Sequence, residues 1–312
     1  MEKVRDELED IGATKVMLQV PDGLRRKAHL ISDHIPAEVT LWGGTCYGAC
    51  DLPLSIGDNH ALIHMGHTCL PDLKHDYHIV YVEGRSHTPF RVPEKIYHKM
   101  EGKIALYSTV QHLDHMKEFK TILDEKGYST CVGEGDPRIK YPGQLLGCNF
   151  TARVKDADTH VYIGTGIFHP LGLSLSMDKD VITLDPVTGE LDSTWEKRDR
   201  MLRIRFAAIQ KIKEAKRIGV IVSVKPGQRR MKEADAICSS CNSCKKVEFD
   251  EVEPELVDSF GWDGMVNTAC PRLALDDHIR FKTTVVTPTE FMIAKEELDW
   301  RGWKVDEIKG RI

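Results

Sequence analysis

The sequence lacks the features that would place this chain in a membrane, on nucleic acid or in a secretory route. No apolar run approaches the ~20 residues that a membrane span needs. The formal net charge of −5 leaves no large basic surface for neutralising phosphates, so no direct nucleic-acid partner is expected. The first ten residues are acidic and helical in character, unlike a signal or transit peptide. These absences predict a cytoplasmic protein with no membrane contact.

Nucleotide-binding loops are missing as well. The chain has no G-x-x-x-x-G-K-[ST] loop, and the turn at Gly164 and Gly166 lacks the third glycine of a dinucleotide fingerprint. Nucleotide hydrolysis and NAD chemistry therefore have little support.

What the sequence does contain is a repeated α/β pattern. Short β-branched runs alternate with amphipathic stretches, which is typical of βαβ units with parallel sheets. Helices are predicted at residues 24–34, 112–126 and about 194–217, with a further helix running toward Cys244. Strands are predicted at 15–20, 38–42, 61–65, 79–82, 104–108, 128–132, 159–163, 181–185, 218–224, 246–250, 265–267 and 284–287.

The order of these elements repeats three times, which predicts three similar α/β domains in a pseudo-threefold arrangement. Their expected bounds are residues 1–98, 99–193 and 194–312, the last including the long linking helix. Each third carries one cysteine in a loop after a strand: Cys50, Cys148 and Cys270. Because ligands of open α/β sheets bind beyond the carboxyl ends of the strands, three facing domains would bring these cysteines together.

The nine cysteines are not expected to form a disulfide framework, because this long, unsecreted chain can build a core and cytosolic thiols stay reduced. An iron–sulfur cluster takes thiolate ligands, and three of them leave one iron open for a substrate. Taken alone, however, each cysteine is as well explained as a small buried apolar residue. Cys69 and Cys131, at or after strand ends, are expected to be buried and inert.

Two denser cysteine patterns are incomplete. Cys46 and Cys50 begin the C-x3-C-x2-C signature of radical enzymes that use S-adenosylmethionine, but Pro53 occupies its third position, so Cys46 is expected to neighbour the site without ligating. A second pattern, Cys238, Cys241 and Cys244, lacks a nearby fourth ligand for a ferredoxin-type or zinc site. It is interpreted as a helix carrying three cysteines partly on one face, with an accessory metal or an oxidation-prone group as open alternatives.

Six longer motifs, in this order, resemble those of the diphthamide-biosynthesis enzymes that act first on elongation factor 2. They are YGACD (47–51), HMGHTCL (64–70), RIKYPGQLLGCN (138–149), IGTGIFHPLG (163–172), KPGQ (225–228) and NTACPRLALDD (267–277). The resemblance covers nearly the whole chain, whose compact size looks like the archaeal homodimeric form.

This resemblance implies 2-(3-amino-3-carboxypropyl)histidine synthase activity. The three matched cysteines would each come from one domain and ligate one [4Fe–4S] cluster, with S-adenosylmethionine at the open iron. Reduction by an electron donor would split a carbon–sulfur bond, giving methylthioadenosine and a 3-amino-3-carboxypropyl radical. That radical would add to imidazole C2 of one histidine on elongation factor 2. A homodimer is expected from the resemblance alone.

Four further residues are candidates for contacts with S-adenosylmethionine. Gln228 lies at a strand-to-helix turn where helix amides meet a carboxylate, and Asp185 ends a strand facing the same centre. Arg272 has the geometry to pair a carboxylate or to hold the Cys270 loop. His169 lies within a motif, where hydrogen-bonded structure is the more ordinary role of a histidine. No catalytic residue is assigned beyond the cluster ligands.

Two rival readings use the same cysteines differently. A quinolinate-synthase-like enzyme also places one cluster cysteine in each of three α/β domains, but its motifs are not found here. A metal-stabilised adaptor would hold zinc through Cys238, Cys241, Cys244 and another ligand. Iron and sulfide, as opposed to zinc alone, would separate the enzyme readings from the adaptor.

Overall fold

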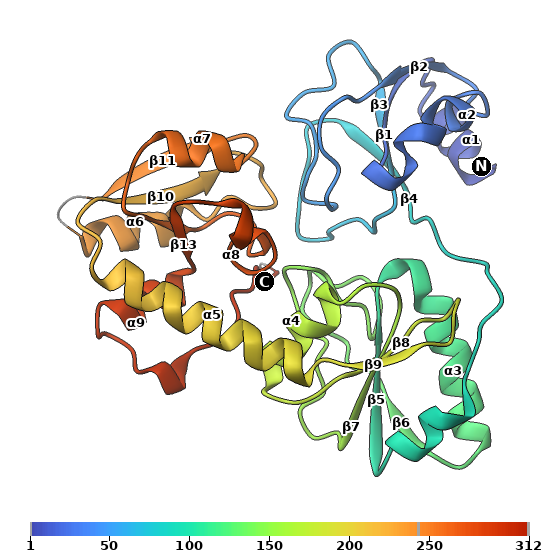
Figure 1. Cartoon of the computed structure of the whole chain (residues 1–312). Coiled ribbons are helices and arrows are strands. Elements are labelled where there is room, and N and C mark those ends of the chain that lie inside the picture. The colour runs from blue at the N-terminus through green and yellow to red at the C-terminus, as the bar shows by residue number, and fades with distance from the viewer. Residues whose placement is uncertain (1, 242–243, 311–312) are drawn as a thin grey trace.

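The computed structural model describes residues 2–241 and 244–310 and shows three α/β lobes around a common centre (Figure 1). Residues 1, 242–243 and 311–312, which belong to the first and third predicted domains, lie outside the described residues. Within the described ranges, no helix combines the length and the apolar character needed to cross a membrane.

The first lobe is built on a four-stranded sheet in the order β2-β1-β3-β4, with every pair parallel. Its core forms from apolar side chains of the sheet and of the helices that cover it. Its elements are α1 (Glu2–Asp10), β1 (Lys15–Gln19), a 3-10 helix (Asp22–Lys27), α2 (Ala28–Ser32), β2 (Glu38–Leu41), β3 (Ala61–Met65) and β4 (His78–Val82).

The second lobe repeats this strand order as β6-β5-β7-β8 and adds β9 at the edge. The β9 strand pairs antiparallel with β8, which is the one departure from an all-parallel arrangement among the described strands. The elements are a 3-10 helix (Glu94–Lys99) whose Ile96 packs in this lobe's core, β5 (Lys103–Ser108), a 3-10 turn (Val110–His112), α3 (Leu113–Glu125), β6 (Ser129–Cys131), β7 (Thr159–Ile163), α4 (Phe168–Met177), β8 (Ile182–Leu184) and β9 (Leu191–Ser193).

The third lobe follows the long helix α5 and has the order β11-β10-β12-β13, again all parallel. Its elements are α5 (Trp195–Lys213), β10 (Ile218–Ser223), α6 (Met231–Ser239), β11 (Lys245–Phe249), α7 (Pro254–Ser259), β12 (Gly264–Asn267), α8 (Arg272–Leu275), a 3-10 helix (Asp277–Arg280), β13 (Thr284–Val286), α9 (Pro288–Ala294) and a 3-10 turn (Trp300–Gly302).

In every lobe the second strand lies at one edge and pairs with the first, and the third and fourth strands follow on the other side of the first. This shared order confirms the predicted α/β fold with three parallel sheets. The bounds of the three predicted domains, at 98/99 and 193/194, stay predictions.

Two local expectations were wrong. The helix expected at 24–34 is a 3-10 helix that runs into the short α2, and no helix was expected where α4 lies. The α4 segment contains two residues that suggest a loop, Pro170 and Gly172. Pro170 lies in the first turn, where a helix tolerates proline. Gly172 is required by packing, because a Cβ there would lie 2.1 Å from the ring of Phe150.

Two segments join the second and third lobes. The α5 helix crosses from the second lobe to the third (Figure 1), and its buried Arg205 forms an ion pair with Glu290 of α9. The chain after α9 then returns to the second lobe, where the amide of Ile308 donates to the carbonyl of Cys148 at 2.8 Å. The segment after α9 therefore helps to hold the loop that carries Cys148.

Candidate functional site

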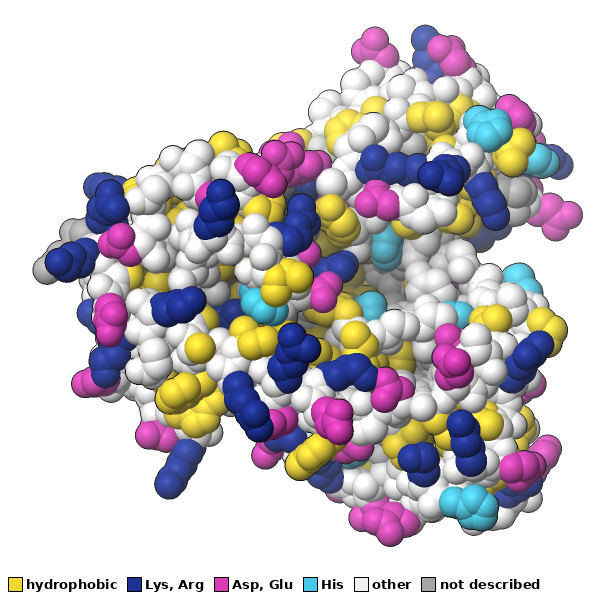
Figure 2. All heavy atoms as spheres, in the orientation of Figure 1, with side chains coloured by type: hydrophobic (Ala, Val, Ile, Leu, Met, Phe, Trp, Pro, Cys, Tyr) yellow, Lys and Arg dark blue, Asp and Glu magenta, His cyan; other side chains and the backbone are white. Residues whose placement is uncertain are grey.

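Three cysteines from three lobes line one pocket, which we call the central pocket. Cys50 lies in the loop between β2 and β3, Cys148 in the loop between β6 and β7, and Cys270 between β12 and α8. His67 and His169 also line it. Figure 2 shows a hollow between the first and second lobes with histidine side chains around it. The structure thus brings together the three cysteines that the repeat predicted would converge.

A close approach of the first and third lobes sets the position of Cys50. A Cβ at Gly227 would lie 2.6 Å from the Cβ of Cys50, so only glycine permits this contact. The next residue, Gln228, directs its side-chain amide to the Cys50 sulfur, with Nε2 and Sγ 3.4 Å apart. The turn predicted at Gln228 therefore lies at the pocket, where the Gln228 side chain contacts Cys50 directly.

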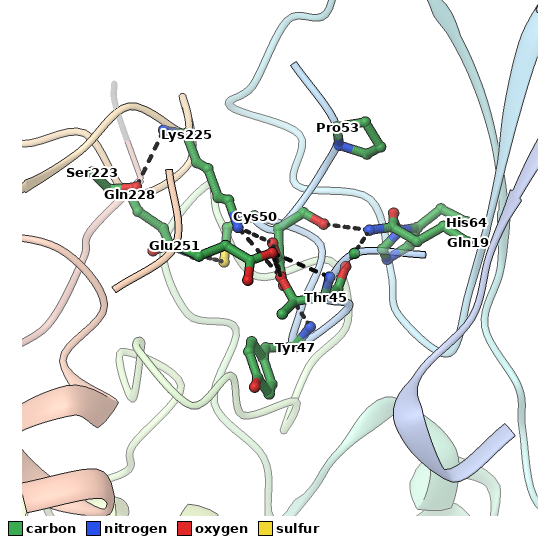
Figure 3. Close-up of polar contacts among 12 residues, drawn as sticks. Gln19, Thr45, Tyr47, Cys50, Pro53, His64, Ser223, Lys225, Gln228 and Glu251 are labelled. Carbon is green, nitrogen blue, oxygen red and sulfur yellow. Dashed lines mark hydrogen bonds and ion pairs between the residues drawn. The ribbon is translucent and has the colours of Figure 1, made fainter. Parts of the chain in front are cut away.

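A buried ion pair closes the same junction. The Lys225 ammonium lies 2.6 Å from Asp51 Oδ1, and both side chains are almost fully buried. Asp51 Oδ2 accepts from the amide of Tyr47 at 2.8 Å, which shapes the loop that carries Cys50. Glu251 adds a second link between the lobes by accepting from the hydroxyl of Thr45 at 3.1 Å (Figure 3).

Arg138, from the second lobe, lines the central pocket and contacts residues of the other two lobes. Its guanidinium donates to the carbonyl of Gly227 at 2.7 Å and lies 3.6 Å from the Asp72 carboxylate. Its positive charge lowers the pKa of the Cys148 thiol, against the larger effect of burial. Its Nε is buried without a partner among the described residues, so an N–H is available to another acceptor at this point.

The cysteine sulfurs are strongly desolvated. Burial raises the pKa of the Cys148 thiol to about 11 and also raises the pKa of Cys50. Burial, and then the nearby Cys50 and Cys148 sulfurs, raises the pKa of Cys270 above its usual range. The raised pKa values keep the three thiols protonated near neutral pH, because three thiolates would repel one another without a cation between them. A metal binds thiolates, so its binding here would release protons.

Buried imidazoles predict a loss of stability in mild acid. Burial lowers the pKa of His67, His160 and His169 to about 4, from the ordinary value of about 6.5 in the unfolded chain. Between these values the unfolded chain binds more protons than the folded one, so the free energy of unfolding falls as the pH drops through this window. Urea unfolding of the metal-free protein across this range measures the effect, and His160→Gln should flatten the slope. A free energy that stays constant down to about pH 4 would contradict neutral burial.

The other predicted contacts have mixed outcomes. His169 lines the central pocket. Arg272 lines it too, but its guanidinium already pairs with Asp276 at 2.7 Å and stacks over the ring of Phe168. Asp185 does not line the pocket. Its carboxylate instead accepts from the amides of two following residues in the turn before β9, which is a structural role.

The cysteines outside the pocket differ from what the sequence predicted. The α6 helix ends at Ser239, so Cys238, Cys241 and Cys244 do not share one helical face. Cys238, near the end of α6, and Cys244, directly before β11, are paired as a disulfide, which departs from the general expectation of reduced thiols and agrees with the oxidation-prone alternative. Cys69 and Cys131 are half-buried, and so are less enclosed than expected.

Several site residues were missed by sequence reasoning. Asp51 and Arg138 lie within the family-like motifs, but nothing in their local pattern indicates contacts across lobes. Gln19 is a buried polar residue at the end of β1, and it hydrogen-bonds His64 of β3. A polar residue that ends a buried strand was the signal that could have identified it.

Known proteins similar to this chain agree with the geometry. The model of a family described as putative diphthamide synthesis protein matches residues 20–305. A 2-(3-amino-3-carboxypropyl)histidine synthase from Pyrococcus horikoshii is 35% identical, covering 99% of this chain and 93% of the relative. One from Methanocaldococcus jannaschii is 30% identical, with 99% and 92% covered. The crystal structure of Dph2 from Pyrococcus horikoshii with a 4Fe–4S cluster superimposes with a TM-score of 0.88 at 34% identity, covering 98% of this chain and 92% of that one.

Proposed function

This chain belongs to the diphthamide synthesis family and is a 2-(3-amino-3-carboxypropyl)histidine synthase, and we propose that Cys50, Cys148 and Cys270 hold its [4Fe–4S] cluster. The enzyme is a transferase of diphthamide biosynthesis. The convergence of these three cysteines, one from each lobe, on the central pocket is the observation that supports the ligand assignment.

The residues of the pocket fit such a cluster. The donor set is three thiols, the ligands that iron–sulfur clusters take, and three ligands leave one iron for a substrate. The unpartnered Nε–H of Arg138 and the amide of Gln228 supply donors beside the sulfurs, where hydrogen bonds tune a cluster. None of these three cysteines takes part in the disulfide, so each is available as a ligand.

We propose that the second substrate is S-adenosylmethionine and that the acceptor is a histidine of elongation factor 2. The reduced cluster supplies the electron that splits the carbon–sulfur bond, giving methylthioadenosine and a 3-amino-3-carboxypropyl radical for imidazole C2. The protein's own residues orient both substrates, because reactants held in position have already lost the translational and rotational entropy that the reaction would otherwise cost. Gln228, His169 and Arg272 line the pocket and are proposed for the contacts with S-adenosylmethionine.

Gln228→Ala should weaken binding of S-adenosylmethionine. One hydrogen bond to a charged group is worth about 1.5–3 kcal/mol, so we expect the dissociation constant to rise about tenfold or more. Equilibrium dialysis against the anaerobic, cluster-loaded protein measures it, with Gln210→Ala on the exposed face of α5 as the matched control. An unchanged constant for Gln228→Ala would mean that this amide serves the Cys50 sulfur alone.

A homodimer, a separate electron donor and a cytoplasmic location complete the proposal. Their support is the resemblance to the archaeal form, and light scattering of the purified protein tests the dimer. A mass corresponding to a single chain of 35.3 kDa would reject it.

The proposed reaction is tested by anaerobic incubation of the reduced, cluster-loaded protein with S-adenosylmethionine and elongation factor 2. We expect methylthioadenosine together with one modified histidine per turnover. Release of 5′-deoxyadenosine would contradict the proposed bond cleavage. Zinc in place of iron and sulfide would contradict the cluster.

A further inference from the structure

A row of three side chains leads from the first sheet into the central pocket. Gln19 of β1 and His64 of β3 are direct partners in the parallel register, and Gln19 Oε1 lies 2.7 Å from His64 Nδ1 (Figure 3). His64 Nε2 in turn lies 2.9 Å from Nδ1 of His67, which lines the pocket. Gln19 and His64 are almost wholly buried, so water does not compete for these bonds.

The direction of every proton in this row follows from Gln19. Its Nε2 donates to the carbonyls of Thr45 and Asp51, at 2.8 and 2.7 Å, and carbonyls can only accept. The amide oxygen must therefore face His64, so His64 Nδ1 carries the hydrogen and donates it. A neutral imidazole protonated on Nδ1 presents a lone pair on Nε2.

His67 must then donate to that lone pair through its own Nδ1–H. Burial lowers the pKa of His64 well below its ordinary value and that of His67 to about 4, so both rings are neutral near pH 7. With its hydrogen fixed on Nδ1, His67 keeps Nε2 unprotonated. That nitrogen is the basic atom of a ring on the pocket wall.

The product places the new carbon group on position 2 of the histidine ring, so the hydrogen of that carbon has to leave. This inference rests on the proposed function. We propose that His67 Nε2 takes the proton released from imidazole C2 of the substrate histidine when the carbon–carbon bond forms there. The row of Gln19 and His64 positions His67 for this step.

The step balances with the groups already named. A carbon radical adds to C2, and restoring the aromatic ring removes one proton and one electron. The proton goes to His67 Nε2, and the electron returns to the oxidised iron–sulfur group that supplied one at the start. Summed over the turnover, the positive charge of the sulfonium substrate leaves as one proton, and methylthioadenosine is neutral.

The surroundings favour His67 over His169, the second imidazole of the pocket. The Asp51 carboxylate favours a positive charge on His67, whereas Arg272 opposes one on His169. The row ends at the amide of Gln19, which has no proton to pass on. It therefore orients His67, and the captured proton must leave again from Nε2.

The alternative role for His64 and His67 is to bind a metal ion together with Cys46. Its sulfur and one nitrogen each of His64 and His67 lie within 4.8 Å of one another, a spacing that would suit a metal ion. His64 Nδ1 already faces Gln19, so a metal there would need the lone pair of His64 Nε2, which the hydrogen bond to His67 uses. Burial raises the pKa of the Cys46 thiol to about 12, which also opposes ligation. A bound metal and an oriented base are therefore mutually exclusive.

The tautomer is testable without turnover. Nitrogen-15 spectra of the imidazole-labelled, metal-free protein near pH 7 should show His67 protonated on Nδ1 and bare on Nε2, assigned by loss of the signals in His67→Asn. A proton on Nε2 overturns the proposal. So does a divalent metal that stays bound through Cys46, His64 and His67 in a variant lacking the three pocket cysteines.

The chemical role of His67 is tested by the coupling ratio, which is the amount of modified histidine formed per methylthioadenosine released. In cluster-loaded His67→Gln we expect normal iron content and continued release of methylthioadenosine. Modified histidine per methylthioadenosine should fall by roughly a hundredfold, at the lower end of what general-base catalysis contributes. Added imidazole should restore part of it in His67→Ala, and deuterium at C2 of the substrate should slow the variant more than the wild type. His160→Gln, another buried histidine but outside the pocket, is the matched control.

A wild-type coupling ratio in both His67→Gln and His67→Ala overturns the proposal. Failure of the proposed function looks different, because the wild type itself would then release no methylthioadenosine.

Discussion

Replacing any one of Cys50, Cys148 or Cys270 by alanine is expected to remove the cluster and abolish product. These three sulfurs come from three lobes, and no other cysteine of the described residues lines the pocket to replace a lost ligand. With two thiolates left, iron per chain should fall from about four to below one. Anaerobic iron and sulfide analysis, the visible absorption of the reconstituted protein and the yield of methylthioadenosine measure the result.

Two controls make this loss specific. Cys131→Ala removes a half-buried thiol of β6 outside the pocket and should keep iron and activity. Joint replacement of Cys238, Cys241 and Cys244 should also keep activity, because none of these three cysteines lines the pocket. Full iron in any of the three single pocket variants, or its loss in a control, would contradict the ligand assignment.

Arg205→Ala is expected to cost the largest amount of stability. The guanidinium donates to both oxygens of Glu290, at 2.8 and 2.5 Å, and to the carbonyls of Ala274 and Val285, at 2.7 and 2.8 Å. Both charged groups are essentially inaccessible to water. Removing one partner leaves an uncompensated buried charge, which costs about 3–5 kcal/mol in the free energy of unfolding.

Urea unfolding of the metal-free protein measures this cost. The matched control is Arg203→Ala on the same helix, whose exposed pair with Asp199 should contribute no more than about 0.5 kcal/mol. Replacing both partners, as in Arg205→Met with Glu290→Gln, should recover part of the loss, because no charge is then buried alone. A loss below about 1 kcal/mol for Arg205→Ala would contradict the importance of this pair.

Much of the fold could be predicted because short apolar runs and the order of strands and helices are visible in the local sequence. The strands β3 and β7 match their predicted bounds, since each is a short buried apolar run of the kind that central parallel strands use. The threefold order of strands and helices was also visible. That order made a common centre for the three cysteines possible, and the resemblance of the longer motifs to a known family turned it into a prediction.

What could not be predicted depends on contacts between distant segments. Arg138, for example, meets Asp72 and Gly227, which come from the other two lobes, and no local spacing encodes those meetings. Asp185 was expected at the centre because it ends a strand, but the following tight turn captures its carboxylate. The Cys238–Cys244 pair joins the last turn of α6 to the residue before β11.

The proposed site residues themselves stay predictions until a cluster is observed on this chain. The most direct measurement is Mössbauer spectroscopy of protein reconstituted anaerobically with iron-57, with and without S-adenosylmethionine. Three cysteine ligands predict one [4Fe–4S] cluster per chain in which one iron of the four changes its signal when S-adenosylmethionine binds, while the other three do not. A spectrum in which all four irons stay unchanged on adding S-adenosylmethionine, or a protein that assembles no cluster, would contradict the account.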